Sequence, residues 1–134
     1  MKRWKILLAD DDPEDKEIIR DAMEMINAGN TINFADDGEH ALQLLSGEYD
    51  LGNIPCLIVL DLNMPKLNGT ETLRRLKLDD RFREVPVIIF STSINSIEME
   101  KCMQLGAHSY ITKPITFNEC LETAQAFHKF WKAY

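Results

Sequence analysis

Short apolar runs alternate with segments in which apolar residues recur at helical spacing, and this alternation repeats five times along the chain. The strand-like runs are residues 5–9, 31–35, 56–60, 87–90 and 109–111. The connections between segments are short, and no repeat or low-complexity linker interrupts them. Strands that alternate with helices in this way build a parallel sheet covered on both faces. The pattern therefore predicts one α/β domain.

The boundaries of the helices follow from residues that cap or break them. Asp12 precedes Pro13 at the start of the first helix, and two capping boxes are expected further on, Asn95 with Glu98 and Thr116 with Glu119. The first helix is expected to end at Gly29 and Asn30, the third to begin near Gly69 and the fourth to stop at Gly106. A short second helix reaches Leu45 and precedes a looser loop over residues 46–55. The first helix carries a stripe predicted to be buried: Ile18, Ile19, Ala22, Met25 and Ile26.

Length and composition narrow the class of protein. The 134 residues suffice for about one domain with its own core, and the 45% hydrophobic and 28% charged content is ordinary for a globular chain. No apolar stretch is long enough to span a bilayer, and no signal peptide precedes the first strand, so a cytoplasmic location is expected. A net charge of −7 argues against nucleic-acid binding. We interpret Cys56, Cys102 and Cys120 as core residues rather than disulfides or zinc ligands.

Charged side chains stand at the ends of three strand-like runs. Asp61 follows the run 56–60, Asp10 and Asp11 follow the first run, and Lys113 follows the last. Ligands of open α/β sheets gather at the carboxyl ends of the strands, so these residues predict one acid-rich cleft that attracts a cation. Taken singly, the acids could only complement a helix dipole, and Lys113 could be a solvated surface lysine. The combination favours a site.

Other polar residues receive a structural interpretation. Asp12 is expected only to cap its helix, and Asp36 and Asp37 are interpreted as turn residues outside the cleft. The three histidines are isolated, without metal-ligand spacing or a neighbouring nucleophile, and receive no role: His40, His108 and His128.

Four passages together resemble the receiver domain of bacterial two-component response regulators. They are residues 6–11 (ILLADD), 57–65 (LIVLDLNMP) with Asn68 and Gly69, 87–91 (VIIFS) and 106–114 (GAHSYITKP). They occur in the family order, each at the end of a strand, and cover essentially the whole chain. The resemblance implies a flavodoxin-like, doubly wound (βα)5 fold with a five-stranded parallel sheet of order 2-1-3-4-5. That order would place Asp10 and Asp11 beside Asp61.

The resemblance also implies a function for the cleft, in which Asp61 accepts a phosphoryl group with Mg²⁺ as cofactor. Asp11 and Asp61 would ligate the metal directly, Asp10 through water, and Asn63 through its backbone carbonyl. Lys113 and Ser91 would contact the phosphoryl oxygens. The proline after the lysine, Pro114, is a cis-peptide candidate that would aim Lys113 inward.

A signalling switch is implied by the same resemblance. Ser91 moves toward the phosphate, Tyr110 swings into the vacated space, and the face made by the fourth helix, fifth strand and fifth helix is biased for partner binding. From the residues alone, Tyr110 could be a half-buried sheet residue. Thr92 stands where a smaller residue is common and would crowd Asp61, while Asn63 and Ser93 cannot activate water. A moderate to long phosphoryl lifetime is therefore expected.

The expected partners are a sensor histidine kinase or histidine phosphotransfer protein and an unidentified downstream target. No membrane partner is expected. Kinase choice would depend on surface residues near the first helix and on Ile115 and Thr116. The last helix carries Phe127, Phe130, Trp131 and Tyr134, interpreted as core with a possible homodimer contact at its end. No output module follows, so residues 1–134 are expected to form a single-domain regulator or phosphorelay shuttle.

Three alternatives use related features. A haloacid-dehalogenase-like phosphatase requires an aspartate two positions after its nucleophile, where this chain has Asn63. A flavin mononucleotide carrier requires a phosphate loop after the first strand, where this chain has acids. A pseudo-receiver would bind partners without chemistry, although every phosphorylation residue is present. The protein is not expected to be an enzyme beyond its own phosphorylation and slow dephosphorylation.

Overall fold

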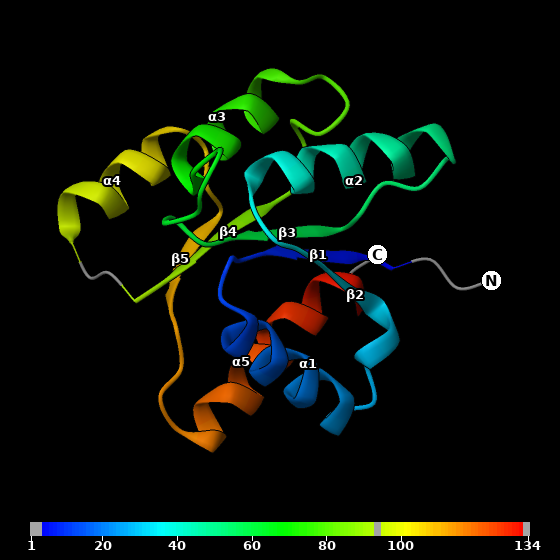
Figure 1. Cartoon of the computed structure of the whole chain (residues 1–134), viewed down its shortest axis with the longest axis vertical. Coiled ribbons are helices and arrows are strands. Elements are labelled where there is room, and N and C mark those ends of the chain that lie inside the picture. Colours follow the sequence, from blue (N-terminus) through cyan, green and yellow to red (C-terminus); the bar gives the residue numbers. More distant parts are fainter. Residues whose placement is uncertain (1–3, 93–94, 133–134) are drawn as a thin grey trace.

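Five parallel strands form one sheet in the order β2-β1-β3-β4-β5 in the computed structural model, which describes residues 4–92 and 95–132 (Figure 1). The strands are β1 (Ile6–Ala9), β2 (Ile32–Ala35), β3 (Leu57–Leu60), β4 (Val87–Ser91) and β5 (Ser109–Thr112). Ala9 pairs with Ala35 on one side and with Leu60 on the other, which aligns the carboxyl ends of three strands. The predicted fold class and strand order are confirmed.

The helices cover both faces of the sheet. They are α1 (Pro13–Met25), α2 (Gly38–Asp50), α3 (Gly69–Leu78), α4 (Ser96–Gln104) and α5 (Phe117–Lys132), with a 3₁₀ turn η1 (Gly29–Thr31). Helices α1 and α5 lie on one face and α2, α3 and α4 on the other (Figure 1). Alternate residues of β1 enter two separate cores, Leu7 with the α2–α4 layer and Leu8 with the α1–α5 layer. None of the helices in the described part of the chain combines the length and the apolar character needed to cross a membrane.

The predicted capping residues hold the helix starts. The Asp12 carboxylate accepts a hydrogen bond from the Glu14 backbone N–H at 2.9 Å, and Asn95 accepts from Ile97 and Glu98. Before α5, the Thr116 hydroxyl accepts from the Glu119 N–H at 3.1 Å, and the Glu119 carboxylate accepts from the Ile115 N–H at 3.0 Å. The bonds to Glu14, Ile97, Glu98 and Glu119 satisfy N–H groups that a helix leaves without a partner, and the bond to Ile115 holds the residue before the cap.

Helix α1 differs from its predicted stripe and end. Ile19, Ala22 and Met23 are buried, whereas Ile18 and Met25 are 44% and 60% exposed. Successive residues are about 100° apart around a helix, so Ile18 lies on the flank of the face that Ile19 buries. The helix ends at Met25 because the chain turns at Asn27, which adopts a left-handed φ of 61°. Gly29 and Asn30 belong to η1 instead.

The loop expected over residues 46–55 is wrong in its first part, because α2 continues to Asp50. The last turn is held by contacts with Phe82, far along the chain, and with Asn53, just after the helix. Tyr49 packs edge-on against Phe82 with ring centroids 6.0 Å apart, and the Asn53 amide donates to Glu48 and to the Trp4 carbonyl. Tertiary contacts of this kind override the turn preference of Ser46 and Gly47.

The aromatic stripe of α5 is largely core, as predicted. Phe127 is fully buried and meets Phe90 of β4 edge-on at a centroid distance of 5.6 Å. Phe130 is half-buried, and Trp131 is 41% exposed. Tyr134 lies outside the described residues.

Candidate functional site

Three carboxylates meet at the carboxyl ends of the two central strands. Asp10 follows β1 and Asp61 follows β3, and both side chains are buried, while Asp11 is exposed. One oxygen of each carboxylate lies within 4.8 Å of the others. The strand order brings together the acids that the sequence predicted to be neighbours.

The backbone around Asp61 is packed against the start of α3. The Asp61 N–H donates to the Ala9 carbonyl at 3.0 Å, and the Gly69 N–H donates to the Leu62 carbonyl at 3.0 Å. A β-carbon on Gly69 would lie 2.1 Å from the Asp61 carbonyl oxygen. Only glycine permits this close approach, which holds the acceptor loop in place.

Lys113 reaches the acids from the end of β5. Its ammonium lies 2.8 Å from Asp10 Oδ2, 3.4 Å from Asp61 Oδ2 and 2.7 Å from Asp15 Oδ2. The Lys113 backbone N–H donates to the Ser91 carbonyl at 3.0 Å, which fixes its position beside β4. The sequence did not indicate Asp15, in the first turn of α1, as a partner of Lys113.

The cis peptide expected at Pro114 is wrong, since every peptide bond among the described residues is trans. The trans form is the more stable isomer of a bond to proline by about 0.5–1 kcal/mol. Lys113 nevertheless points inward, because its backbone is held against β4 and its ammonium is surrounded by carboxylates.

Burial and mutual repulsion set the protonation of the cluster. Burial is the main cause that raises the pKa of Asp61 to about 6, and the charge of Asp10 adds to this effect while Lys113 opposes it. Burial also raises the pKa of Asp10, against the influence of the Lys113 ammonium. For Lys113, burial favours the neutral form, but the contacts with Asp10, Asp15 and Asp61 outweigh it and raise its pKa. The lysine is therefore charged, and the carboxylates carry excess negative charge.

The four other predicted site residues lie around this centre. Ser91 is buried at the end of β4, and Thr92 beside it is exposed. Asn63 is exposed, and its backbone N–H donates to the Asp61 carboxylate. Tyr110 is half-buried on β5, opposite Ile89 of β4, and packs against the core on the α2–α4 side.

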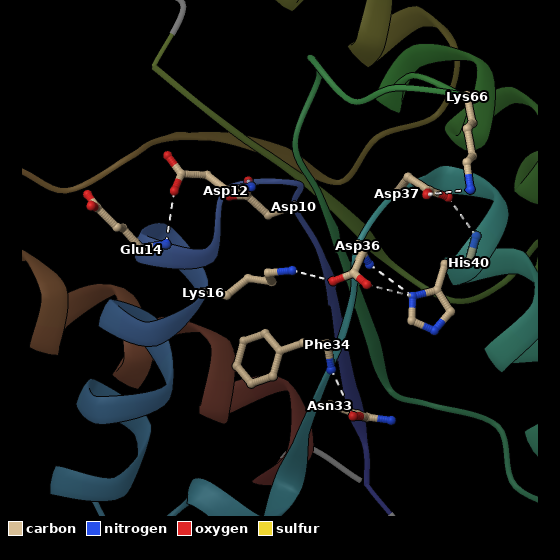
Figure 2. Close-up of polar contacts among 10 residues, drawn as sticks. All are labelled: Asp10, Asp12, Glu14, Lys16, Asn33, Phe34, Asp36, Asp37, His40 and Lys66. Carbon is tan, nitrogen blue, oxygen red and sulfur yellow. Dashed lines mark hydrogen bonds and ion pairs between the residues drawn. The ribbon is translucent and has the colours of Figure 1, made fainter.

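A second polar network lies at the end of β2 and is separate from the acid cluster. Figure 2 shows Lys16 extending from α1 to Asp36, whose backbone N–H donates to His40 Nδ1 at 3.0 Å. Asp37 caps α2 by accepting from the His40 N–H at 2.8 Å. Asp36 and Asp37 are turn residues outside the cleft, as predicted, whereas His40 has a structural contact that the sequence did not indicate.

The donor set at the acid cluster fits a hard divalent cation. Asp10 Oδ2 is buried and accepts no hydrogen bond of good geometry from the described residues, although the Lys113 ammonium is near. Carboxylate oxygens are the ligands that Mg²⁺ prefers, and three negative groups against one lysine leave charge for a cation to neutralise. A cation there would relieve the repulsion that raises the carboxyl pKa values.

Comparison with known proteins agrees with this geometry. Residues 6–125 match the model of the response regulator receiver domain. Response regulator Rcp1 of Synechocystis sp. is 29% identical over 94% of this chain and 87% of its own length. The structure of the phosphorylated cyanobacterial phytochrome response regulator RcpA is 32% identical, covers 97% of this chain and 94% of its own, and superposes with a TM-score of 0.84. The Mn²⁺-bound form of Rcp1 superposes with a TM-score of 0.79 at 29% identity, over 94% of this chain and 92% of that one.

The chain belongs to the family of response regulator receiver domains. Receiver domains are phosphoacceptor signalling proteins of two-component systems, and they take their phosphoryl group from histidine kinases. The relatives of this chain are signalling proteins rather than enzymes that turn over a substrate.

Proposed function

We propose that Asp61 is the phosphoacceptor of this receiver domain. The observation that supports this assignment most directly is the position of Asp61, buried at the end of a central strand with Lys113 3.4 Å away and two further acids beside it. Its raised pKa places ionisation near neutral pH, where a carboxylate retains nucleophilicity. Asp10 and Asp11 are the cation ligands and not acceptors.

Mg²⁺ is the proposed cofactor, held by Asp10, Asp11, Asp61 and the backbone carbonyl of Asn63. When bound, the cation supplies positive charge that neutralises the carboxylates and the phosphoryl oxygens. The support is the cluster of three carboxylates and the Mn²⁺-bound form of the related protein Rcp1.

In the transfer reaction, an Asp61 oxygen attacks the phosphorus of a phosphohistidine on the kinase or phosphotransfer partner. A phosphorus–oxygen bond forms while the phosphorus–nitrogen bond breaks, and the electron pair of that bond passes to the departing imidazole. The Lys113 ammonium and the Ser91 hydroxyl contact the phosphoryl oxygens as charge develops on them. The product is an aspartyl phosphate.

Intact-protein mass after incubation with acetyl phosphate and Mg²⁺ tests the assignment. One base-labile phosphoryl addition is expected in the wild type and in Asp12→Asn, because asparagine caps a helix about as well as aspartate. None is expected in Asp61→Asn or in the presence of a chelator. Addition to Asp61→Asn would move the acceptor to another residue and contradict the proposal.

The proposed signal is a packing change that begins at Ser91 and ends at Tyr110. Ser91 is buried and Tyr110 half-buried on neighbouring strands, so movement of one toward a phosphoryl group makes room for the other. The face of α4, β5 and α5 would then change for a downstream target. Adding beryllofluoride should change the NMR chemical shifts of residues on that face. In Tyr110→Ala, these changes should be restricted to the immediate neighbours of residue 110.

The proposed kinase or phosphotransfer surface lies beside the acid cluster on α1 and the segment after β5. Ile18 lies beside Pro114, and Ile115 and Phe117 further along are 91% and 53% exposed. Exposed apolar groups next to an acceptor suit the apolar surface of a helical histidine-bearing partner. Ile115→Glu should reduce transfer from a partner but not phosphorylation by acetyl phosphate.

The alternatives find no support in the site. Asn63, two positions after Asp61, is exposed and cannot serve as the general acid and base of a dehalogenase-type phosphatase. The acids after β1 repel the phosphate of a flavin nucleotide. A pseudo-receiver would lack the assembled lysine and carboxylates that this chain has.

A further inference from the structure

Asp15 on α1 is the nearest carboxylate to the Lys113 ammonium, at 2.7 Å, and it lies outside the three-acid cluster. The same ammonium is 3.4 Å from Asp61. Asp15 is thus closer to the Lys113 ammonium than Asp61, the proposed phosphoacceptor, is. Its side chain is 30% exposed, whereas that of Asp10 is fully buried.

The Lys113 side chain is only 10% exposed, and its ammonium lies near three carboxylates. A void of about 20 Å³ separates α1 from the segment after β5, and its walls include Ile18, Ile19, Phe90 and Pro114. The ammonium lies 5.8 Å from the centroid of the Phe90 ring. The ammonium thus lies between Asp15 on one side and Asp61 on the other, at 2.7 and 3.4 Å.

We propose that Asp15 is a positioning residue that holds the Lys113 ammonium toward α1 and competes for it with the phosphoryl group on Asp61. This rests on the proposed role of Asp61. An ammonium has three donors, and here Asp15 occupies one that an aspartyl phosphate would otherwise receive. Asp15 also adds negative charge near the phosphoryl position, so competition and repulsion act in the same direction. The acid thereby weakens phosphoryl binding and favours return to the unphosphorylated state.

The same contact affects the cation in the opposite direction. While Asp15 holds the ammonium, the positive charge of Lys113 is displaced away from the cluster of Asp10, Asp11 and Asp61. Without Asp15 the lysine would neutralise those acids more completely, and their attraction for Mg²⁺ would fall. Loss of Asp15 should therefore tighten binding of a phosphoryl mimic and weaken binding of the metal alone. A merely structural role would weaken both.

The test measures two affinities of the full chain by NMR titration, Mg²⁺ alone and beryllofluoride at saturating Mg²⁺. In Asp15→Asn, beryllofluoride should bind about fivefold tighter and Mg²⁺ a few-fold more weakly, factors typical of a partly exposed ion pair. Glu14→Gln is the matched control, since it removes the same charge from the same helical turn. The exposed Glu14 side chain points away from Asp10 (Figure 2), and its substitution should change neither affinity appreciably. Asp15→Glu should restore both affinities toward those of the wild type.

A double-substitution cycle shows whether Asp15 acts through the lysine. In a Lys113→Ala background, Asp15→Asn should keep only the small gain that comes from lost repulsion, so most of its effect on beryllofluoride binding should disappear. Weaker or unchanged beryllofluoride binding in Asp15→Asn alone would overturn the inference, and so would an equal gain in Glu14→Gln. If the wild type bound no beryllofluoride and accepted no phosphoryl group, the proposed acceptor role would fail as well. If the wild type binds beryllofluoride and Asp15→Asn binds it no more tightly, the role of Asp15 would be overturned while the acceptor role of Asp61 would stand.

Discussion

Replacing Asp61 by asparagine should stabilise the metal-free protein at neutral pH. Burial raises the pKa of Asp61 from 3.8 to about 6, so the folded state binds this proton more tightly than the unfolded state. Between pH 4 and 6 the unfolded chain ionises while the folded carboxyl stays protonated, and stability falls as pH rises. Above pH 6 both states are ionised and the loss is constant. A difference of about 2.2 pKa units corresponds to about 3 kcal/mol.

Asparagine carries no charge and avoids this loss. The free energy of unfolding of Asp61→Asn should therefore exceed that of the wild type by up to about 3 kcal/mol at pH 7 and equal it near pH 4. This figure already includes the ion pair with Lys113, which lowers the pKa of Asp61. The shift corresponds to roughly 10 °C in Tm for a chain of this size. Urea unfolding of both proteins in a chelator from pH 4 to 8 measures the difference, in which titration of other groups largely cancels. A difference independent of pH, or growing toward low pH, would refute the reasoning.

Three further predictions concern the same region. Mg²⁺ affinity of the wild type should fall as pH drops below about 6, because the cation must displace the proton from Asp61; titration at pH 5 and 7.5 checks this, and equal affinities would contradict it. Gly69→Ala should lower the free energy of unfolding by about 1–3 kcal/mol and slow phosphorylation, since its β-carbon would meet the Asp61 carbonyl. The control Gly47→Ala has open space in α2 and should be neutral or stabilising in thermal unfolding. The aspartyl phosphate should persist for minutes or longer in Mg²⁺, and Thr92→Gly should shorten its lifetime by opening access for water, as followed by intact mass; loss within seconds in the wild type would contradict the expectation.

The sequence was sufficient for the fold and for most of the site because both depend on local patterns. Runs of apolar residues fully buried on both faces marked β1, β3 and β4, and residues that prefer caps marked the starts of α1, α4 and α5. Once strand order followed from the family resemblance, the acids after β1 and β3 had to meet at one edge. The structure brings them within 4.8 Å, as that order requires.

Three features were decided by contacts between residues far apart in the chain. The last turn of α2 depends on the contact between Tyr49 and Phe82, which no local pattern at Ser46 and Gly47 indicates. The inward direction of Lys113 depends on surrounding carboxylates and not on a cis bond at Pro114.

The contact between Asp15 and Lys113 joins residues 98 positions apart, across the seam between α1 and β5. In the sequence, Asp15 is one of several acids that complement a helix N-terminus, and nothing local distinguishes it from Glu14. Local propensity and periodicity determine which elements form and which side chains end the strands. Which partner a charged side chain selects depends on distances that exist only after the helices pack on the sheet, and that choice belongs to the tertiary structure.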